Sequence, residues 1–344
     1  SNSSLVILDR FALPNANSIL FAQSGSGKSY TAKVEILRHL MQGTKVIVID
    51  PEREYRQLAE SVNGTYFKLS VHSKEKINPF DLEVNAFNER EGFADHIQAL
   101  TEIISLMVEG LNPEEKSVVD KALLTTYKKF GWSPKKPRKD NSKIYPTLSD
   151  FYAVLKDFKQ TKLRHRLDKF VTGSLSEVFN SQTNLELANR LVVFDIKDLP
   201  ESIRPIMLLV LAQFVQNQVK SVPKKRMLVI DEAWLLLQHE ESARFISGLV
   251  RRARKYYLGV SIITQQASDF LQNSYGRAIA SQSALRILMR QDTTTITNVA
   301  QEFRLSEYEQ KYLLTCDRGE ALIIADQHHV AVKVVASEKE HPLI

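Results

Sequence analysis

Short apolar runs alternate with amphipathic stretches along most of the chain. The runs lack the polar residue at every second position that a half-exposed strand would show, so they are typical of strands buried on both faces of a parallel sheet. Between them, apolar residues recur at helical spacing. The pattern predicts strands at 18–22, 45–50, 66–69, 191–196, 227–231, 258–264 and 285–290, and helices at 29–41, 202–219 and 242–255. The expected fold class is α/β, with a mostly parallel sheet and helices on both faces.

Two regions depart from this alternation. Residues 81–184 show helical spacing throughout, with helix starts at Asn112 (Asn-Pro-Glu-Glu) and Thr147 (Thr-Leu-Ser-Asp) and a charged, proline-containing loop at 133–140. The runs 321–325 and 330–335 predict a C-terminal antiparallel hairpin. We therefore expect an α/β core of residues 1–80 and 185–344, with residues 81–184 inserted as an all-helical subdomain.

Composition narrows the class of protein. The 344 residues are 43% hydrophobic and 25% charged, which provides a full core. The single cysteine, Cys316, excludes an internal disulfide framework and is typical of a protein from a reducing compartment. No base lies near it in sequence to activate its thiol as a nucleophile. The longest apolar run, Ile206–Ala212, is far shorter than the ~20 residues that span a bilayer, and no signal peptide is visible. The chain begins Ser-Asn-Ser-Ser close to its first strand, which we interpret as a fragment without its upstream domain.

Charge is unevenly distributed, although the net charge is only +6. Residues 81–120 are rich in Asp and Glu, whereas residues 131–170 are rich in Lys and Arg. Two interpretations are open. The blocks fold against each other, or they form a polar surface that meets a neighbouring subunit or an anionic partner.

A glycine-rich segment, Ala-Gln-Ser-Gly-Ser-Gly-Lys-Ser at 22–29, joins the first predicted strand to the first predicted helix. Glycines let main-chain N–H groups wrap around phosphate oxygens, and the helix start directs its positive dipole end at the same anion. We predict that Lys28 reaches the β- and γ-phosphates of ATP and that Ser29 holds Mg²⁺. Ala22 replaces the usual first glycine, which is tolerable if it keeps a negative φ. The predicted nucleotide-binding residues are Ser24, Gly25, Ser26, Gly27, Lys28, Ser29 and Tyr30.

A second motif, Arg226-Met-Leu-Val-Ile-Asp-Glu-Ala-Trp234, ends a predicted strand in two acids. Open α/β sheets bind their ligands at the carboxyl ends of their strands. We predict that Asp231 orders the Mg²⁺ shell and that Glu232 polarises the water that attacks the γ-phosphate. An Asp at a strand–helix junction is also a common helix N-cap. Its combination with Lys28 and Ser29 favours an ATPase, with ATP and Mg²⁺ as its ligands.

A carboxamide follows the strand 258–264. Gln265 is placed by sequence order to contact both the γ-phosphate and the attacking water, and its alternative role is that of an ordinary turn residue. Asp50-Pro51-Glu52 ends another strand, and we interpret it mainly as a turn, with support of Mg²⁺ as the lesser alternative.

The helix 242–255 carries a group of cations, Arg244, Arg251, Arg252, Arg254 and Lys255. They form either a solvated basic face or a source of an arginine finger, a guanidinium that reaches a neighbouring subunit's γ-phosphate. Arg251 and Arg254 are the preferred fingers, and Arg286 and Arg290 are weaker candidates.

The order of these motifs resembles that of a known family. Along the chain they are Gln23–Ser29, Val48-Ile-Asp-Pro-Glu52, Ile77-Asn-Pro-Phe80, Leu228-Val-Ile-Asp-Glu-Ala-Trp234, Arg251-Arg-Ala-Arg-Lys255 and Ile263-Thr-Gln265. This order resembles the C-terminal motor domain of the large VirB-type (TraC-like) ATPases of type IV secretion and conjugation systems. These ATPases are relatives of the HerA/FtsK class of hexameric DNA pumps. The resemblance covers nearly the whole chain.

The resemblance implies a RecA-like P-loop NTPase core, a missing N-terminal domain and a homohexamer at the cytoplasmic face of the inner membrane. There, ATP hydrolysis would drive pilus assembly and substrate transfer through protein partners: sister ATPases, the secretion channel and pilin subunits. The alternative is a HerA-type DNA translocase that grips the phosphate backbone with the basic insert and loses affinity steeply as salt rises. No zinc finger, helix-turn-helix or aromatic stacking strand supports base-specific recognition. A third hypothesis, a nucleotide-bound scaffold with little turnover, is opposed by Glu232.

Overall fold

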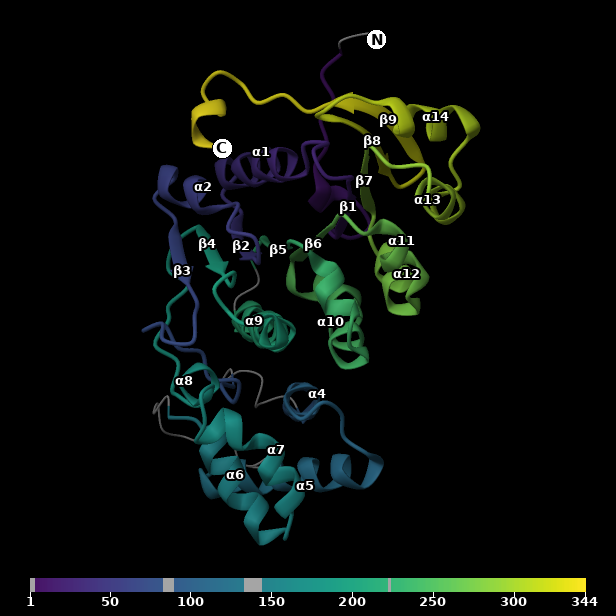
Figure 1. Ribbon diagram of the computed structural model, residues 1–344. Helices are drawn as coiled ribbons and strands as arrows, with labels where there is room; N and C mark the ends of the chain where they lie inside the picture. The colour runs from purple at the N-terminus through teal and green to yellow at the C-terminus, as the bar shows by residue number, and fades with distance from the viewer. Residues whose placement is uncertain (1–3, 83–89, 133–143, 222–223) are drawn as a thin grey trace.

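A mixed β-sheet forms the centre of the molecule in the computed structural model (Figure 1). The structure describes residues 4–82, 90–132, 144–221 and 224–344, so the predicted loop 133–140 lies outside it. Within these ranges the sheet has nine strands in the order β3-β4-β2-β5-β6-β1-β7-β8-β9. They are β1 (Ser18–Phe21), β2 (Lys45–Asp50), β3 (Thr65–Lys68), β4 (Leu191–Asp195), β5 (Arg226–Ile230), β6 (Leu258–Thr264), β7 (Leu285–Met289), β8 (Glu320–Ala325) and β9 (His328–Lys333). The pairings from β3 to β7 are parallel, whereas β8 and β9 add an antiparallel hairpin, as predicted.

Both faces of the parallel strands are covered by helices, which explains their uninterrupted apolar runs. On β1, Ile19 and Phe21 belong to the core shared with α9 (Arg204–Ser221) and α10 (Glu240–Ala253). Leu20 belongs to the core on the other face, shared with α1 (Lys28–Met41) and α2 (Arg56–Ser61). Figure 1 shows α1 and α2 above the sheet and α9 and α10 below it. Successive residues of one strand point to opposite faces, so each finds an apolar partner.

The segment between β3 and β4 is helical wherever it is described. It contains α4 (Arg90–Met107), α5 (Pro113–Lys129), α6 (Leu148–Asp157), α7 (Thr161–Val171) and α8 (Ser176–Phe179), which lie together below α9 and α10 (Figure 1). The predicted helix starts are confirmed. The Asn112 side chain accepts a hydrogen bond from the N–H of Glu115 (2.8 Å), and the Glu115 carboxylate accepts one from the N–H of Asn112 (3.0 Å). Thr147 and Asp150 form the same capping box. Helix α4 joins this region to the core by packing on α9 and α10.

The acidic and basic blocks meet in this helical region. Arg166 pairs with Glu115 at 3.0 Å and donates to the main-chain carbonyl of Val108, and Lys169 lies 3.7 Å from Glu109. The first interpretation of the charge pattern therefore holds for these two pairs of residues.

The C-terminal part follows β6. Its helices are α11 (Ala267–Gln272), α12 (Ser274–Ser281), α13 (Ile296–Phe303) and α14 (Glu307–Thr315). Short 3₁₀ helices occur along the whole described chain: η1 (Arg10–Ala12), η2 (Glu201–Ile203), η3 (Ala233–Leu237), η4 (Arg254–Tyr256) and η5 (His341–Leu343). The chain after β9 crosses α1, where Glu340 pairs with Arg38 at 3.0 Å, and the Leu343 carbonyl accepts from Ser61 on α2 (2.8 Å). In the described ranges, no helix has both the length and the apolar character needed to cross a bilayer.

A buried arginine ties the N-terminal segment to the sheet. Arg10 is 1% exposed. Its guanidinium donates to the carbonyl of Ala16, to the hydroxyls of Ser18 on β1 and Ser261 on β6, and to Glu35 on α1 (2.9 Å). These contacts fix the start of β1 against its neighbours.

Candidate functional site: a phosphate loop facing two acids

The loop after β1 has the backbone conformation that a phosphate-binding loop requires. Gly25 (φ 80°) and Gly27 (φ 100°) occupy the left-handed region, which glycine adopts without steric cost, and α1 begins at Lys28. A Cβ at Gly27 would also lie 3.2 Å from the main-chain nitrogen of Gly319, so the position is crowded. Ala22 is not among the residues with positive φ, which meets the condition under which an alanine fits there.

Lys28 lies between the two predicted acids. Its ammonium is 2.7 Å from Oδ1 of Asp231 and 2.5 Å from Oε1 of Glu232, and all three side chains are buried. The sheet order explains this meeting. The parallel strands β1 and β5 are separated only by β6, so their carboxyl ends lie at one edge of the sheet. The structure therefore brings together Lys28, Asp231 and Glu232, which are about 200 residues apart in sequence.

Glu232 is held in an unusual conformation with all its acceptor oxygens engaged. Its backbone is left-handed (φ 47°, ψ 45°), a strained state for a residue with a side chain. Oε1 accepts from Lys28 and from the amide of Gln265 (2.6 Å), and Oε2 accepts from the indole of Trp234 (3.0 Å). The cap position of η3 is Glu232, which forms no side-chain cap, and Oδ1 of Asp231, for which the capping alternative was open, accepts from the N–H of Glu232 (2.8 Å). Gln265, predicted to contact phosphate and water, contacts the predicted base directly.

Negative charge exceeds positive charge at this edge. Burial raises the pKa of the Asp231 carboxyl, and Lys28 opposes this rise without cancelling it. Burial lowers the pKa of the Lys28 ammonium, but the two acids together bring it above its ordinary value. Burial also raises the pKa of Asp50, at the end of the neighbouring β2, to about 6. The edge is therefore suited to gaining a cation.

Asp50 forms the strand-end turn that we predicted. Its carboxylate accepts from the main-chain N–H groups of Glu54 (3.1 Å) and Tyr55 (2.9 Å). The turn places two further residues, which the sequence did not identify, beside the predicted site. Glu54 accepts a hydrogen bond from the hydroxyl of Ser29, and the hydroxyl of Tyr55 donates to Oδ2 of Asp231 (3.0 Å). The available signal was their position directly after a strand that ends at the same edge.

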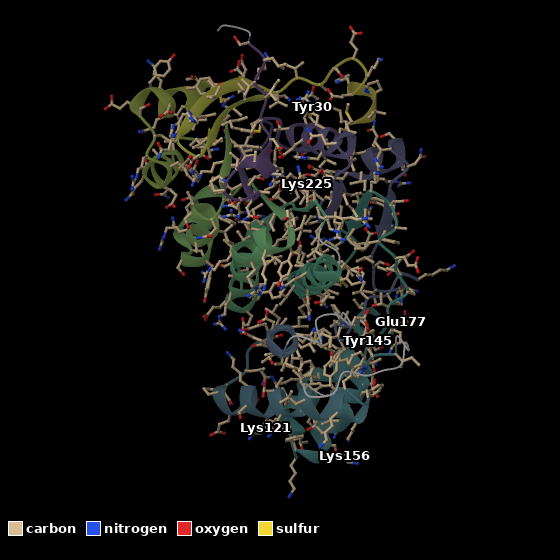
Figure 2. The ribbon with its side chains drawn as sticks, turned by 180° about the vertical axis from the view of Figure 1, so that it is seen from behind. Tyr30, Lys121, Tyr145, Lys156, Glu177 and Lys225 are labelled. Atoms are coloured by element: carbon tan, nitrogen blue, oxygen red, sulfur yellow. The ribbon has the colours of Figure 1, made fainter. Side chains whose placement is uncertain are left out.

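The oxygens around Ser29 fit a hard divalent cation. The Ser29 hydroxyl and the carboxylates of Glu54 and Asp231 are close enough to interact, and Mg²⁺ is bound through few protein oxygens together with phosphates and waters. Among the described residues, no group of three or more His, Cys, Asp or Glu side chains is placed to hold a metal by itself. The side chain of Tyr30 points elsewhere. Its hydroxyl accepts from the N–H of Ala336 (2.8 Å), beside the C-terminal segment in Figure 2.

The arginines fall at opposite edges of the sheet. Arg251 and Arg254 are exposed at the end of α10 and in η4, just before β6 begins. Strand β6 separates them from Gln265, and its length is about 20 Å at 3.3 Å per residue. Neither arginine therefore reaches the phosphate loop of its own chain. Arg290 lies at the loop, because its carbonyl accepts from the N–H of Gln23 (2.9 Å). Arg286 instead faces Phe303 on α13.

A parallel sheet with a glycine-rich loop before α1 and acids at the end of β5 defines a P-loop NTPase of the RecA-like type. The family model of the TraG P-loop domain matches residues 6–336, and the chain belongs to this family. No curated protein sequence matches the chain at a significant level.

Solved structures share the fold. VirB4 of Thermoanaerobacter pseudethanolicus is 28% identical, with a TM-score of 0.87 over 99% of this chain and 96% of that one. The bacterial conjugative coupling protein TrwB is 13% identical, with a TM-score of 0.60 over 94% of this chain and 85% of that one. TrwB in complex with the non-hydrolysable ATP analogue ADPNP gives a TM-score of 0.53 at 14% identity, over 93% and 78% of the two chains. The resemblance to VirB-type ATPases and the RecA-like fold class are confirmed.

Proposed function

We propose that the chain is an ATP-hydrolysing motor domain that energises type IV secretion or conjugation through protein partners. The observation that carries this proposal is the convergence of Lys28, Asp231, Glu232 and Gln265 on the phosphate loop. Membership of the TraG P-loop family and the likeness to VirB4 support it.

Binding and hydrolysis are coupled through Lys28 in this proposal. The main-chain N–H groups of Ser24 to Tyr30 and the start of α1 receive the phosphates of ATP. The phosphates draw the Lys28 ammonium away from the acids, because a triphosphate offers it a higher negative charge. Oε1 of Glu232 then becomes free to accept a proton from the attacking water. The amide of Gln265 is bonded to the base in the structure and turns to the γ-phosphate when ATP is bound, so it distinguishes the loaded site from the empty one.

Ser29 and Asp231 would hold Mg²⁺, and Glu54, which accepts from the Ser29 hydroxyl, would add negative charge beside it. When bound, Mg²⁺ neutralises negative charge on the β- and γ-phosphates. The excess of acids at this edge supports the assignment, because burial raises the pKa of the Asp231 carboxyl and Lys28 offsets this rise only in part.

The location, the partners and the assembly that we propose are those that the resemblance to the family implies. We place the motor at the cytoplasmic face of the inner membrane, attached through other secretion components: sister ATPases, the channel and pilin subunits. A homohexamer is the assembly in which Arg251 or Arg254, remote from the phosphate loop of its own chain, reaches that of a neighbour. The division into a core of 1–80 and 185–344 and an insert of 81–184 belongs to the same proposal.

A DNA translocase is the alternative. The exposed cations at the end of α10, Arg251, Arg252, Arg254 and Lys255, favour contact with a phosphate backbone. Further cations, including Lys121 and Lys156, lie at the far end of the helical region from Tyr30 (Figure 2).

Steady-state ATP hydrolysis, measured with and without double-stranded DNA from low to high salt, separates the two functions. A motor that acts on proteins hydrolyses ATP at a rate that DNA leaves unchanged. Strong stimulation by DNA that disappears as salt rises would support the translocase, because each neutralised phosphate releases counterions. Absence of hydrolysis under all conditions, including in the assembled ring, would contradict both.

A further inference from the structure

A tight turn from the C-terminal part of the chain rests on the phosphate loop. The turn covers Asp317–Glu320, with the N–H of Glu320 donating to the carbonyl of Asp317 (3.0 Å) and Gly319 at φ 82°. The carboxylate of Glu320 accepts from the N–H of Asp317 (2.9 Å), which closes the turn a second time. A positive φ at the third position is what a type II turn requires, and it makes Arg318 the second residue of the turn.

Main-chain hydrogen bonds fix this turn on both sides. The N–H of Gly319 donates to the carbonyl of Ser26 in the phosphate loop (2.9 Å), and the carbonyl of Gly319 accepts from Val334, just after β9 (2.8 Å). A Cβ built on Gly27 would lie 3.5 Å from Cγ of Arg318. The aliphatic part of the Arg318 side chain therefore lies directly against the last glycine before Lys28.

The guanidinium of Arg318 is available to a ligand. The residue is exposed, and within the described residues no acidic side chain or carbonyl accepts from it. Two acids lie close to it in sequence. The carboxylate of Glu320 is engaged by the turn itself, and the adjacent Asp317 forms no ion pair with Arg318 within the described residues. Arginine binds phosphate oxygens well, because its planar fork offers several charged N–H donors.

The side of the phosphate loop on which Arg318 lies indicates which part of the nucleotide it contacts. In the sheet, β1 has β6 and then β5 on one side, and β7 and then β8 on the other. Glu232 follows β5 and Gln265 follows β6, whereas Arg318 precedes β8. The guanidinium therefore lies across the loop from the groups that surround the γ-phosphate.

We propose that Arg318 binds the phosphates that ATP and ADP share, so that it contributes affinity for both nucleotides. The proposal rests on the phosphate loop binding ATP, as proposed above. The proposal explains why the C-terminal turn contacts Gly27. The turn brings a cationic side chain to the side of the phosphate loop on which the loop has none of its own.

The test compares Arg318→Ala, Arg318→Lys and a control, Lys311→Ala, which removes an exposed cation from α14 nearby. Affinities for ATP, ADP and pyrophosphate are measured by competition with a fluorescent ADP analogue. Loss of a charge-assisted hydrogen bond should weaken all three ligands roughly 10-fold in Arg318→Ala. Arg318→Lys should recover part of this loss, and Lys311→Ala should bind like the wild type. The loss of kcat/KM should match the loss of affinity.

Three results would overturn the proposal. One is unchanged ADP affinity in Arg318→Ala, provided that its melting temperature without nucleotide equals that of the wild type. The second is weaker ADP binding with unchanged pyrophosphate binding, which would assign Arg318 to the base or ribose. The third is a loss of kcat far beyond the loss of ADP affinity, as a finger would give. A wild-type protein that binds no ATP would instead contradict the phosphate-loop assignment on which this proposal rests.

Discussion

Two buried cations, Lys28 and Arg10, occupy opposite ends of β1 and have opposite surroundings. Lys28 is 7% exposed and Arg10 is 1% exposed, so both need partners within the protein. Arg10 has hydroxyls, a carbonyl and the single acid Glu35 around it. Lys28 has two acids, with further carboxylates of Asp50 and Glu54 close behind.

The pKa shifts of the partners show what this difference means. Burial raises the pKa of the Glu35 carboxyl, but Arg10 and His39 more than offset it, so the pKa falls below its ordinary value. The pKa of Asp231 stays raised in spite of Lys28. The hydrogen bonds of the Arg10 guanidinium are thus completed within the protein, although burial still lowers its pKa, whereas Lys28 belongs to an edge that still lacks positive charge. A completed network stabilises the fold, and an incomplete one is prepared for a ligand.

The largest effect should follow from Lys28→Ala. Phosphate charge in the loop would then be met by main-chain dipoles alone, and the acids Asp231 and Glu232 would repel it. We expect ATP binding to be abolished in calorimetric titrations, with the fold retained by circular dichroism. Arg10→Met is the matched control and should bind ATP normally whenever it is folded. ATP affinity of Lys28→Ala equal to that of the wild type would remove the basis of the phosphate-loop assignment.

The second prediction concerns the arginines at the far edge. A finger supplied in trans contributes ~10³–10⁵-fold to hydrolysis, so Arg254→Ala or Arg251→Ala should lose most activity while binding ATP. Because these residues lie about 20 Å from their own loop by the length of β6, activity per subunit should rise as the protein assembles. Mixing Lys28→Ala with Arg254→Ala should restore hydrolysis, since the first chain lends its arginine to the intact site of the second. A rate independent of concentration, without recovery on mixing, would show that one chain completes the reaction and would favour Arg290.

The third prediction separates binding from chemistry. Glu232→Gln keeps the size of the side chain and its contact with Trp234, but it removes the proton acceptor. ATP should stay bound while turnover falls by ~10²–10⁴-fold, the usual contribution of a general base. Single-turnover hydrolysis measures this directly. Turnover close to that of the wild type would mean that another group, with Glu54 the nearest carboxylate to Ser29, activates the water.

The sequence predicted the sheet and the main residues of the site because both depend on local patterns. Apolar runs gave the strands within a residue or two, and the glycine-rich loop and the Asp-Glu pair each adjoin such a run. The carboxyl ends of parallel strands lie at one edge of the sheet, which is why Lys28 and Asp231 could be predicted to share a site. That only β6 separates β1 from β5 could not be predicted from the sequence.

Contacts that depend on strand order could not be predicted. Arg318 is separated from Gly27 by most of the chain, and only the placement of β8 beyond β7 brings its turn to the phosphate loop. Arg10 looks like an ordinary charged residue until Ser18 and Ser261 pair side by side on β1 and β6. The sequence likewise does not show that Arg290 lies at the phosphate loop, because this depends on the pairing of β7 with β1.

The fourth prediction tests the completed network. Arg10→Met leaves Glu35, the Ala16 carbonyl and two hydroxyls without their donor. Removing one partner of a buried ion pair costs about 3–5 kcal/mol, and urea unfolding should show a loss of this order. Adding Glu35→Gln should recover part of it, because the unpaired charge is removed. A loss below about 1 kcal/mol, the range of an exposed pair, would mean that water replaces the guanidinium.

The smallest effect is expected from Asp50, whose carboxylate is disfavoured mainly by burial and to a lesser degree by Asp231 and Asp195. Its pKa is raised to about 6 in the folded protein from an ordinary value of 3.8. The folded state therefore holds the proton more tightly, and the contribution of Asp50 to stability falls as pH rises through this interval and is constant above it. The total change is on the order of 2–3 kcal/mol, at about 1.4 kcal/mol for each pKa unit.

Asp50→Asn cannot ionise, so the difference in unfolding free energy between wild type and variant isolates this group. Without nucleotide, the variant should gain on the wild type between pH 4 and pH 7, as followed by urea unfolding at each pH. Mg²⁺ should reduce that gain at the upper end, because a bound cation favours the charged carboxylate. A difference that stays constant with pH would show that Asp50 ionises as easily in the folded protein as in the unfolded chain, and that burial does not raise its pKa.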